Sequence, residues 1–295
     1  MKIVDAFTFY NELDLLELRL ETLDSFVDYF VICEATTTHS GHEKPLILRE
    51  NLDRFARFSS KMLVHTVRDL PTNDPWQAEQ GQRNALRGVL KSSFNEGDIV
   101  IVGDADEIIN PQSLDLAIES LENQPLAHFA QNLYYYYLNL QEVSGTLLSS
   151  SGDFPDEMPK KWLGSRMMRV DFAVDSNLNL VRGKDFLHSG TRVTNGGWHF
   201  SFVGSEGSAS PEERIRQKLS AYAHQEKNTF RIRRSARRRV ARNQDIMGRR
   251  GAKFEVVPID DTFPSPVAKN PEKYRNLIAV IDQTPRSRLG LRRAK

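Results

Sequence analysis

The sequence has a single cysteine, almost no net charge and no long apolar run. Cys33 has no second cysteine with which to form an internal disulfide, which is typical of a protein from a reducing compartment. No apolar run approaches the roughly 20 residues that cross a bilayer, and no basic segment followed by an apolar one opens the chain. We therefore expect a cytoplasmic protein, with a peripheral contact to the inner face of the membrane left open.

The composition is that of a globular protein. The 295 residues are 39% hydrophobic and 27% charged, which suits one large domain or one and a half. The near balance of 40 Lys and Arg against 39 Asp and Glu hides an asymmetry, because the segment from residue 230 onward is rich in arginine. The rest of the chain is therefore acidic on balance.

Short apolar runs alternate with helical patterns through the first half. Asn11 is expected to cap the first helix, with Glu12 in its first turn. This alternation predicts an α/β fold whose central sheet is mostly parallel, with helices on both faces. The second half is expected to be richer in β-structure. The expected strands are residues 2–7, 28–34, 62–67, 99–102, 127–140, 162–170 and 197–203, and the expected longer helices are residues 76–94, 114–121, 211–224 and 230–242.

Three carboxylates follow the apolar run IVIV at residues 99–102, in the stretch GDADE. Asp104 and Asp106 are two residues apart, so both can reach one hard cation such as Mg²⁺ or Mn²⁺. A cation at this position would neutralise a diphosphate as it leaves. The alternative is a solvated turn. Glu107 is interpreted either as a partner behind the metal ligands or as a helix N-cap.

Several longer segments resemble glycosyltransferase family 17 over about residues 3–226. The segments are DAFTFYNELDLLELRL, VDYFVICEATTTHSGHEKPL, QRNAL, IVIVGDADEI, HFAQNLYYYYLN, GGWHFSFVG and KLSAYAH. The resemblance implies a GT-A-like nucleotide-sugar-binding fold and an inverting, metal-dependent transferase. Its expected donor is a UDP-sugar, UDP-N-acetylglucosamine above all, and its expected acceptor is a glycan or glycolipid hydroxyl.

The resemblance also implies roles for single residues. Asp104 and Asp106 would hold Mn²⁺ or Mg²⁺ on the donor diphosphate, and His199 is the candidate third ligand. Strand alternation places His199 with Ser201 on the face opposite Trp198, Phe200 and Phe202. The alternative for His199 is a strand histidine bonded to the backbone.

Other polar residues lie where the nucleotide is expected. Asp5, Asn11, Glu12 and Glu34 follow or end predicted strands, where a uridine and ribose would lie. Asn11 and Glu12 could instead serve only the helix end. Arg83 is expected to pair with phosphate, the alternative being an exposed helix arginine.

An inverting transfer needs a general base on the acceptor side. Glu206 is our candidate, and Asp185 and Asp153 lie in loops of the same half. The alternative for each is an ordinary loop acid, which is the preferred interpretation of Asp153. Trp162 is a candidate for stacking on the acceptor sugar.

The arginine-rich segment is expected to extend a catalytic domain of residues 1–229 as a basic extension of residues 230–295. It is interpreted as a contact with an anionic membrane, a clamp on donor phosphates, or a solvated face. Nucleic acid is not expected, because no known binding motif accompanies the charge. The arginines are Arg231, Arg233, Arg234, Arg237, Arg238, Arg239, Arg242, Arg249 and Arg250.

Two rival functions remain open. An aspartate-nucleophile phosphatase also places a D-x-D after a strand, although it usually does so at the start of the chain. The other rival is a sugar-binding protein that has the same fold but has lost catalysis. Turnover of a UDP-sugar separates the transferase from both.

Overall fold

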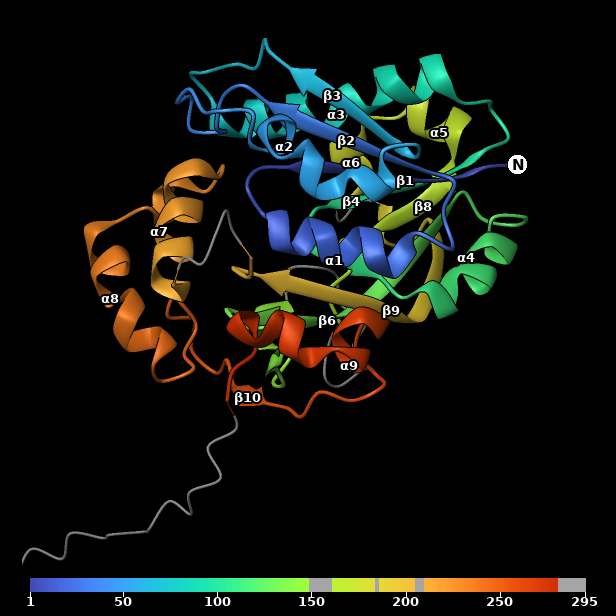
Figure 1. Ribbon diagram of the computed structural model, residues 1–295. Coiled ribbons are helices and arrows are strands. Elements are labelled where there is room, and N and C mark those ends of the chain that lie inside the picture. Colours follow the sequence, from blue (N-terminus) through green and yellow to red (C-terminus); the bar gives the residue numbers. More distant parts are fainter. Residues whose placement is uncertain (149–160, 184–185, 205–209, 281–295) are drawn as a thin grey trace, which may run out of the picture.

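A ten-stranded sheet carries the fold, with helices packed on both of its faces (Figure 1). The computed structural model describes residues 1–148, 161–183, 186–204 and 210–280. The strands are β1 (Ile3–Phe9), β2 (Tyr29–Ala35), β3 (Met62–Val67), β4 (Ile99–Asp104), β5 (Glu107–Ile109), β6 (Leu126–Tyr135), β7 (Leu140–Glu142), β8 (Arg166–Arg169), β9 (Gly190–Ser201) and β10 (Phe254–Val256). The α-helices are α1 (Leu13–Leu23), α2 (Ile47–Glu50), α3 (Pro75–Ser93), α4 (Leu114–Ser120), α5 (Val170–Asp175), α6 (Leu178–Val181), α7 (Pro211–Ala221), α8 (Phe230–Val240) and α9 (Ser265–Lys269). Short 3₁₀ helices are η1 (Leu52–Phe58), η2 (Pro111–Ser113), η3 (Thr146–Leu148), η5 (Gln225–Lys227) and η6 (Pro271–Leu277).

The first half of the sheet is parallel, in the order β4-β1-β2-β3. Alternation along β1 sends Val4 and Ala6 to the face that α3 covers, and Phe7 and Phe9 to the face that α1 covers. These strands are apolar on both faces because helices cover both. The expected α/β class, with helices on both faces, is confirmed.

The second half of the sheet is mixed. β8 runs antiparallel to both β4 and β6, whereas β9 runs parallel to β6 and antiparallel to the short β5. The parallel pairing is therefore confined to the first four strands and to the β6–β9 pair. The second half contains the strands β6 to β10 but also the helices α5 to α9, so the expectation that it is richer in β-structure is not confirmed.

Strand β9 departs from the predicted bounds at both ends. It begins at Gly190, earlier than expected, and ends at Ser201. Phe202 has a φ of 59°, so the backbone leaves the strand there. The expected grouping of Phe202 with Trp198 and Phe200 on one strand face is therefore wrong. Phe202 packs instead in a separate apolar cluster beneath α7 and α8.

The predicted helix cap at Asn11 is also wrong. Helix α1 begins at Leu13, its N-cap residue is Glu12, and the Glu12 side chain makes no capping hydrogen bond. Glu12 Oε2 instead accepts from the backbone N–H groups of Tyr10 and Asn11, 3.2 and 3.0 Å away. Asn11 Nδ2 donates to Gln217 Oε1 on α7, so this asparagine joins two elements rather than capping one.

The chain after residue 230 packs against the rest. Ala236 and Val240 of α8 pack with Ile215 and Leu219 of α7, and Figure 1 shows the two helices side by side. β10 pairs with β7, so the same segment also extends the sheet. The domain boundary at residue 230 stays a prediction. Among the described helices, none combines the length and the apolar character needed to cross a bilayer.

Candidate functional site

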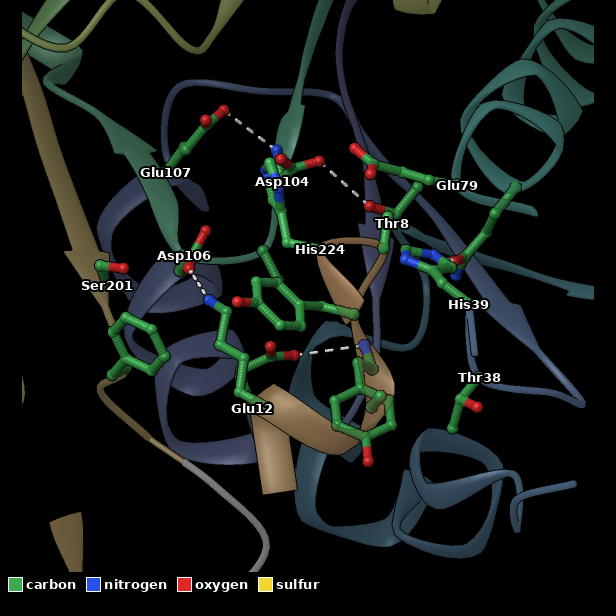
Figure 2. A pocket seen from close by; sticks show the side chains of 18 of the residues that line it. Thr8, Glu12, Thr38, His39, Glu79, Asp104, Asp106, Glu107, Ser201 and His224 are labelled. Atoms are coloured by element: carbon green, nitrogen blue, oxygen red, sulfur yellow. Dashed lines mark hydrogen bonds and ion pairs between the residues drawn. The ribbon is translucent and has the colours of Figure 1, made fainter. Parts of the chain in front are cut away.

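The carboxyl ends of β1 and β4 open into a cavity of about 390 Å³, part of which Figure 2 shows. The parallel register brings Thr8 of β1 beside Asp104 of β4, and Thr8 Oγ1 donates to Asp104 Oδ1 at 3.2 Å. Helices α3 and α7 supply further lining residues. Because β1 and β4 are parallel neighbours, residues distant in the sequence meet at one edge, the usual ligand position in such sheets.

A buried arginine fixes the backbone of residues 104–107, which we call the acidic turn. Arg19 Nη1 donates to the carbonyl oxygens of Asp104 and Glu107, each at 2.8 Å. The other guanidinium nitrogens bind both oxygens of Asp5 at 2.6 and 2.7 Å, and the side chains of Arg19 and Asp5 are fully buried. Asp5 therefore supports the acidic turn through Arg19 and does not line the cavity. The sequence had predicted that Asp5 lies near the nucleotide.

Both oxygens of the Asp104 carboxylate are held by guanidinium groups. Arg83 Nη2 donates to Oδ1 at 3.0 Å, and Arg182 Nη2 donates to Oδ2 at 2.9 Å. Burial alone would raise the pKa of Asp104, but Arg182 and Arg83 outweigh it and hold that pKa well below its usual range. Arg83 is buried, so the alternative of an exposed helix arginine is wrong.

Glu107 is a fully buried member of β5 and not a helix N-cap. Arg182 donates to both of its oxygens at 2.8 and 2.9 Å, and Trp162 Nε1 donates to Oε1 at 2.8 Å. Arg182 thus links Glu107 to Asp104. The interpretation of Glu107 as a partner behind the site is the one that agrees with these contacts.

Asp106 faces the cavity between a lysine and a histidine. Lys218 Nζ lies 2.7 Å from Asp106 Oδ2, and His199 Nε2 lies 3.6 Å from the same oxygen. The β5–β9 register pairs Glu107 with His199, which brings the histidine to the acidic turn. Burial opposes the charge of Asp106, but Lys218 and His199 outweigh it and keep the pKa well below its usual range.

Asp106 and His199 have the spacing of a ligand pair for a hard cation, provided that Lys218 first releases Asp106 Oδ2. Their 3.6 Å separation is near the roughly 3 Å that separates adjacent ligands at typical metal–oxygen distances of about 2.1 Å. Asp104 does not fit as it lies, because both of its oxygens are bound to guanidinium groups. Within the described ranges, no group of three or more His, Cys, Asp or Glu side chains is arranged to hold a metal ion. A cation there would need other ligands from water or a phosphate, a common arrangement for Mg²⁺.

The remaining predicted nucleotide residues separate into two groups. Glu12, Arg83 and Asp104 line the cavity, and burial raises the pKa of Glu12 above its usual range, with Lys218 offsetting part of the effect. Glu34 is fully buried and does not line the cavity. Its Oε1 accepts from Lys44 Nζ at 3.2 Å and from a backbone N–H of α2 at 3.0 Å.

The candidate bases cannot be placed. Glu206, Asp185 and Asp153 all lie outside the described residues. Trp162 does line the cavity, and its ring centroid lies 4.5 Å from that of His199. Its stacking role on an acceptor stays a prediction.

Sequence reasoning missed three cations that organise this site. Arg182 follows α6 in a segment with no motif, and nothing in the sequence pairs it with the acidic turn. Lys218 lies within the quoted segment KLSAYAH, so a signal for it was present. Arg19 lies at a buried position among the leucines of α1, where an unpaired charge would be costly, and this could have predicted a buried partner.

The first half of the chain matches a known family. Residues 1–144 match the family model described as "Glycosyltransferase family 17". A β-1,4-mannosyl-glycoprotein 4-β-N-acetylglucosaminyltransferase of Rattus norvegicus is 31% identical over 158 residues, covering 49% of this chain and 29% of the rat protein. The Homo sapiens protein of the same name is 31% identical over 158 residues, covering 49% and 30%. The chain thus spans under a third of the length of these curated relatives. The resemblance drawn from the motifs is confirmed for residues 1–144, and GGWHFSFVG and KLSAYAH lie beyond that match.

Solved structures give more remote likenesses. A crystal structure of S. aureus TarS 1–349 is 14% identical at a TM-score of 0.39, covering 81% of this chain and 73% of that one. Mouse xyloside xylosyltransferase 1 in its apo form is 11% identical at a TM-score of 0.31, covering 76% and 83%.

Proposed function

We propose that this chain, which matches glycosyltransferase family 17 over residues 1–144, transfers a sugar from a nucleoside diphosphate donor to a hydroxyl group. The expected donor is UDP-N-acetylglucosamine, and the expected acceptor is a glycan or glycolipid. The observation that supports the proposal best is the cavity at the ends of the parallel strands, where buried acids and cations meet. The reaction is an inverting one in this proposal, on a GT-A-like fold.

The residues of the cavity suit a diphosphate donor. Arg83 and Lys218 both line the cavity and carry the positive charge that phosphate oxygens require. Arg19 and Arg182 hold the turn on which Asp104 and Asp106 lie, so the acids are fixed before any ligand arrives.

A divalent cation is part of the proposal, with Asp106 and His199 as its protein ligands. Bound Mn²⁺ or Mg²⁺ would neutralise charge on the departing diphosphate. Asp104, which the sequence predicts as a metal ligand together with Asp106, would first have to release Arg83 or Arg182. The general base stays a prediction on Glu206 or Asp185.

Calorimetry tests the proposal directly. UDP and UDP-N-acetylglucosamine are titrated into the protein with and without Mn²⁺, alongside Asp106→Asn and the matched control Asp115→Asn. Asp115 is exposed on α4. We expect Mn²⁺-dependent binding that Asp106→Asn weakens by about tenfold or more, as the loss of a charged ligand does, and that Asp115→Asn leaves unchanged. A folded wild-type protein that binds neither nucleotide would overturn the proposal.

The two rivals make different predictions. A phosphatase needs a free carboxylate as nucleophile, and both oxygens of Asp104 are engaged by guanidinium groups, which disfavours that role. Hydrolysis of a generic phosphate ester that Asp104→Asn abolishes would nevertheless support the phosphatase. UDP-sugar binding without hydrolysis or transfer to any glycan would support the non-catalytic sugar-binding protein.

We also propose a peripheral contact with an anionic membrane through α8. Arg231, Arg234 and Arg238 recur on one helix face and are exposed, and Phe230 at the helix start is 76% exposed. An arginine face beside an exposed aromatic ring suits an anionic lipid surface. Not every arginine of the segment is available, since Arg249 is bound to Asp245 at 2.7 Å.

Vesicle co-sedimentation tests the membrane contact. We expect binding to phosphatidylglycerol vesicles that falls with salt and is lost in Arg234→Glu/Arg238→Glu. The control Arg68→Glu/Lys91→Glu makes the same change of charge at exposed positions outside α8. Equal binding to phosphatidylcholine, or none to either lipid, would contradict the contact. A cytoplasmic location stays a prediction.

A further inference from the structure

Lys218 of α7 binds the acidic turn and also lines the cavity. It lies near the end of α7, more than a hundred residues from the turn in the sequence, and its Nζ donates to Asp106 Oδ2 at 2.7 Å. The side chain is 27% exposed and lines the cavity, with Nζ 5.3 Å from the centre of the Phe202 ring. The Lys218 side chain therefore forms part of the cavity wall.

The carboxylate that Lys218 holds is the one best placed for a cation. His199 Nε2 faces the same oxygen, Asp106 Oδ2, at 3.6 Å. A divalent cation bound between Asp106 and His199 would share that oxygen with the ammonium group, and two positive groups on one oxygen repel strongly at low dielectric. Lys218 and a divalent cation therefore compete for Asp106.

The other cations of the site are less free to move. Arg182 is bound to Asp104 and Glu107, and Arg83 is bound to Asp104 and Glu79. Their side chains are 10% and 5% exposed, against 27% for Lys218. A lysine also ends in a compact charge on a flexible four-carbon chain, which can change partner without moving its helix. Of these three cations bound to Asp104, Asp106 or Glu107, Lys218 is thus the one most able to exchange one anionic partner for another.

We propose that Lys218 is an exchangeable counter-ion: it holds Asp106 while the site is empty, and donates to the donor diphosphate when a divalent cation takes its place on Asp106. This inference rests on the proposed function for its second half. The first half, competition between Lys218 and the cation for Asp106, concerns only this chain and a metal ion. Lys218 is then a binding residue for the donor and not a proton acceptor.

Substitution of Lys218 by methionine should change two affinities in opposite directions. Lys218→Met keeps an unbranched apolar chain of similar length against Phe202 and removes the charge. Mn²⁺ alone should bind more tightly, because its competitor is gone. UDP in the presence of Mn²⁺ should bind about tenfold or more weakly, the loss typical of a hydrogen bond between charged groups, while uridine should bind unchanged.

Two further variants sharpen this comparison. Lys218→Arg keeps the charge and should retain weak Mn²⁺ binding together with much of the UDP affinity. Lys91→Met makes the same substitution at an exposed position on α3 and should change neither affinity. Circular dichroism and thermal unfolding confirm that each variant is folded.

The outcomes separate this inference from the proposed function. Loss of both Mn²⁺ and UDP affinity in folded Lys218→Met would mean that the lysine only supports the structure, and would overturn the inference. Unchanged UDP affinity would overturn it as well. If the wild-type protein binds no UDP at all, the proposed function fails. The Mn²⁺ titration alone then tests the competition for Asp106. Mn²⁺ binding that is no tighter in Lys218→Met than in wild type would overturn the inference.

Discussion

Arg182 holds Glu107 through both carboxylate oxygens, at 2.8 and 2.9 Å, and extends the same guanidinium group to Asp104. Burial opposes the charge of this arginine, but Asp104 and Glu107 outweigh it and raise its pKa. The guanidinium group thus binds both acidic side chains at once. Arg182 therefore fixes the two acids relative to each other at the wall of the cavity.

Removal of this guanidinium should destabilise the protein strongly. In Arg182→Met, the fully buried Glu107 loses its cation and the partly exposed Asp104 keeps only Arg83, so we expect a loss of about 3–5 kcal/mol in the free energy of unfolding. Urea unfolding at neutral pH measures this loss. The control Arg68→Met removes an exposed arginine and should change stability by less than about 0.5 kcal/mol. Similar losses in both variants would contradict a special role for Arg182.

Gly164, which packs against Glu107 and Trp162, should also be sensitive to substitution. A Cβ added at Gly164 would overlap both Glu107 Oε1 and Trp162 Nε1, so Gly164→Ala must displace both side chains or the backbone at residue 164. We expect a loss of about 1–3 kcal/mol in stability, as overpacking usually costs, and weaker UDP binding because the turn shifts. Calorimetry and urea unfolding check both effects.

Gly88 provides the matched control for that substitution. It lies within α3, and an added Cβ would meet nothing within 4 Å. Gly88→Ala should therefore stabilise the protein by about 0.5–1 kcal/mol through helix propensity, and should leave UDP binding unchanged. Destabilisation by both substitutions would show that crowding at Gly164 is not the cause.

The sequence predicted the parts of the site that depend on local pattern. Apolar runs located β1, β2, β3 and β4, and the acids after β4 follow directly from the sequence. Because neighbouring parallel strands end at one edge, the position of the cavity followed as well. The prediction for Glu34 failed, because Glu34 does not line the cavity. A position at a strand end does not determine which way the side chain faces.

The contacts that complete the site could not be predicted in the same way. Lys218 and Asp106 are 112 residues apart, and Arg182 and Glu107 are 75 residues apart. Helical or strand periodicity relates residues only within one element, so it carries no information on such pairs. The first half of β9, GTRVTN, is polar and gave no strand signal, yet it pairs with the buried β6. Tertiary pairing overrode local propensity there.

The buried cysteine should be unreactive in the native protein. Cys33 is fully buried in β2, and burial raises the pKa of its thiol to about 12. Little thiolate is present at pH 8, and reagents cannot reach it. A thiol reagent such as DTNB should label the unfolded protein within minutes and the native protein only as slowly as it opens. Rapid labelling under native conditions would contradict this burial.

The depressed pKa of Asp106 predicts how stability depends on pH. An acid whose pKa is lower in the folded state contributes stability that is complete above the unfolded value of about 4 and is lost as the pH falls towards the folded value. Wild-type protein should therefore lose stability more steeply than Asp106→Asn below about pH 5, by up to about 1.4 kcal/mol per pH unit for this one group. Burial lowers the pKa of Lys218, but Asp106 outweighs burial and raises it. Lys218 therefore loses its charge, and its contribution to stability, only in strong base. It does not affect the loss of stability below about pH 5. Urea unfolding of both proteins between pH 3 and pH 7 measures the difference, with Asp115→Asn as the exposed control expected to follow the wild type. Parallel curves for wild type and Asp106→Asn would mean that Lys218 and His199 do not hold this carboxylate as an anion.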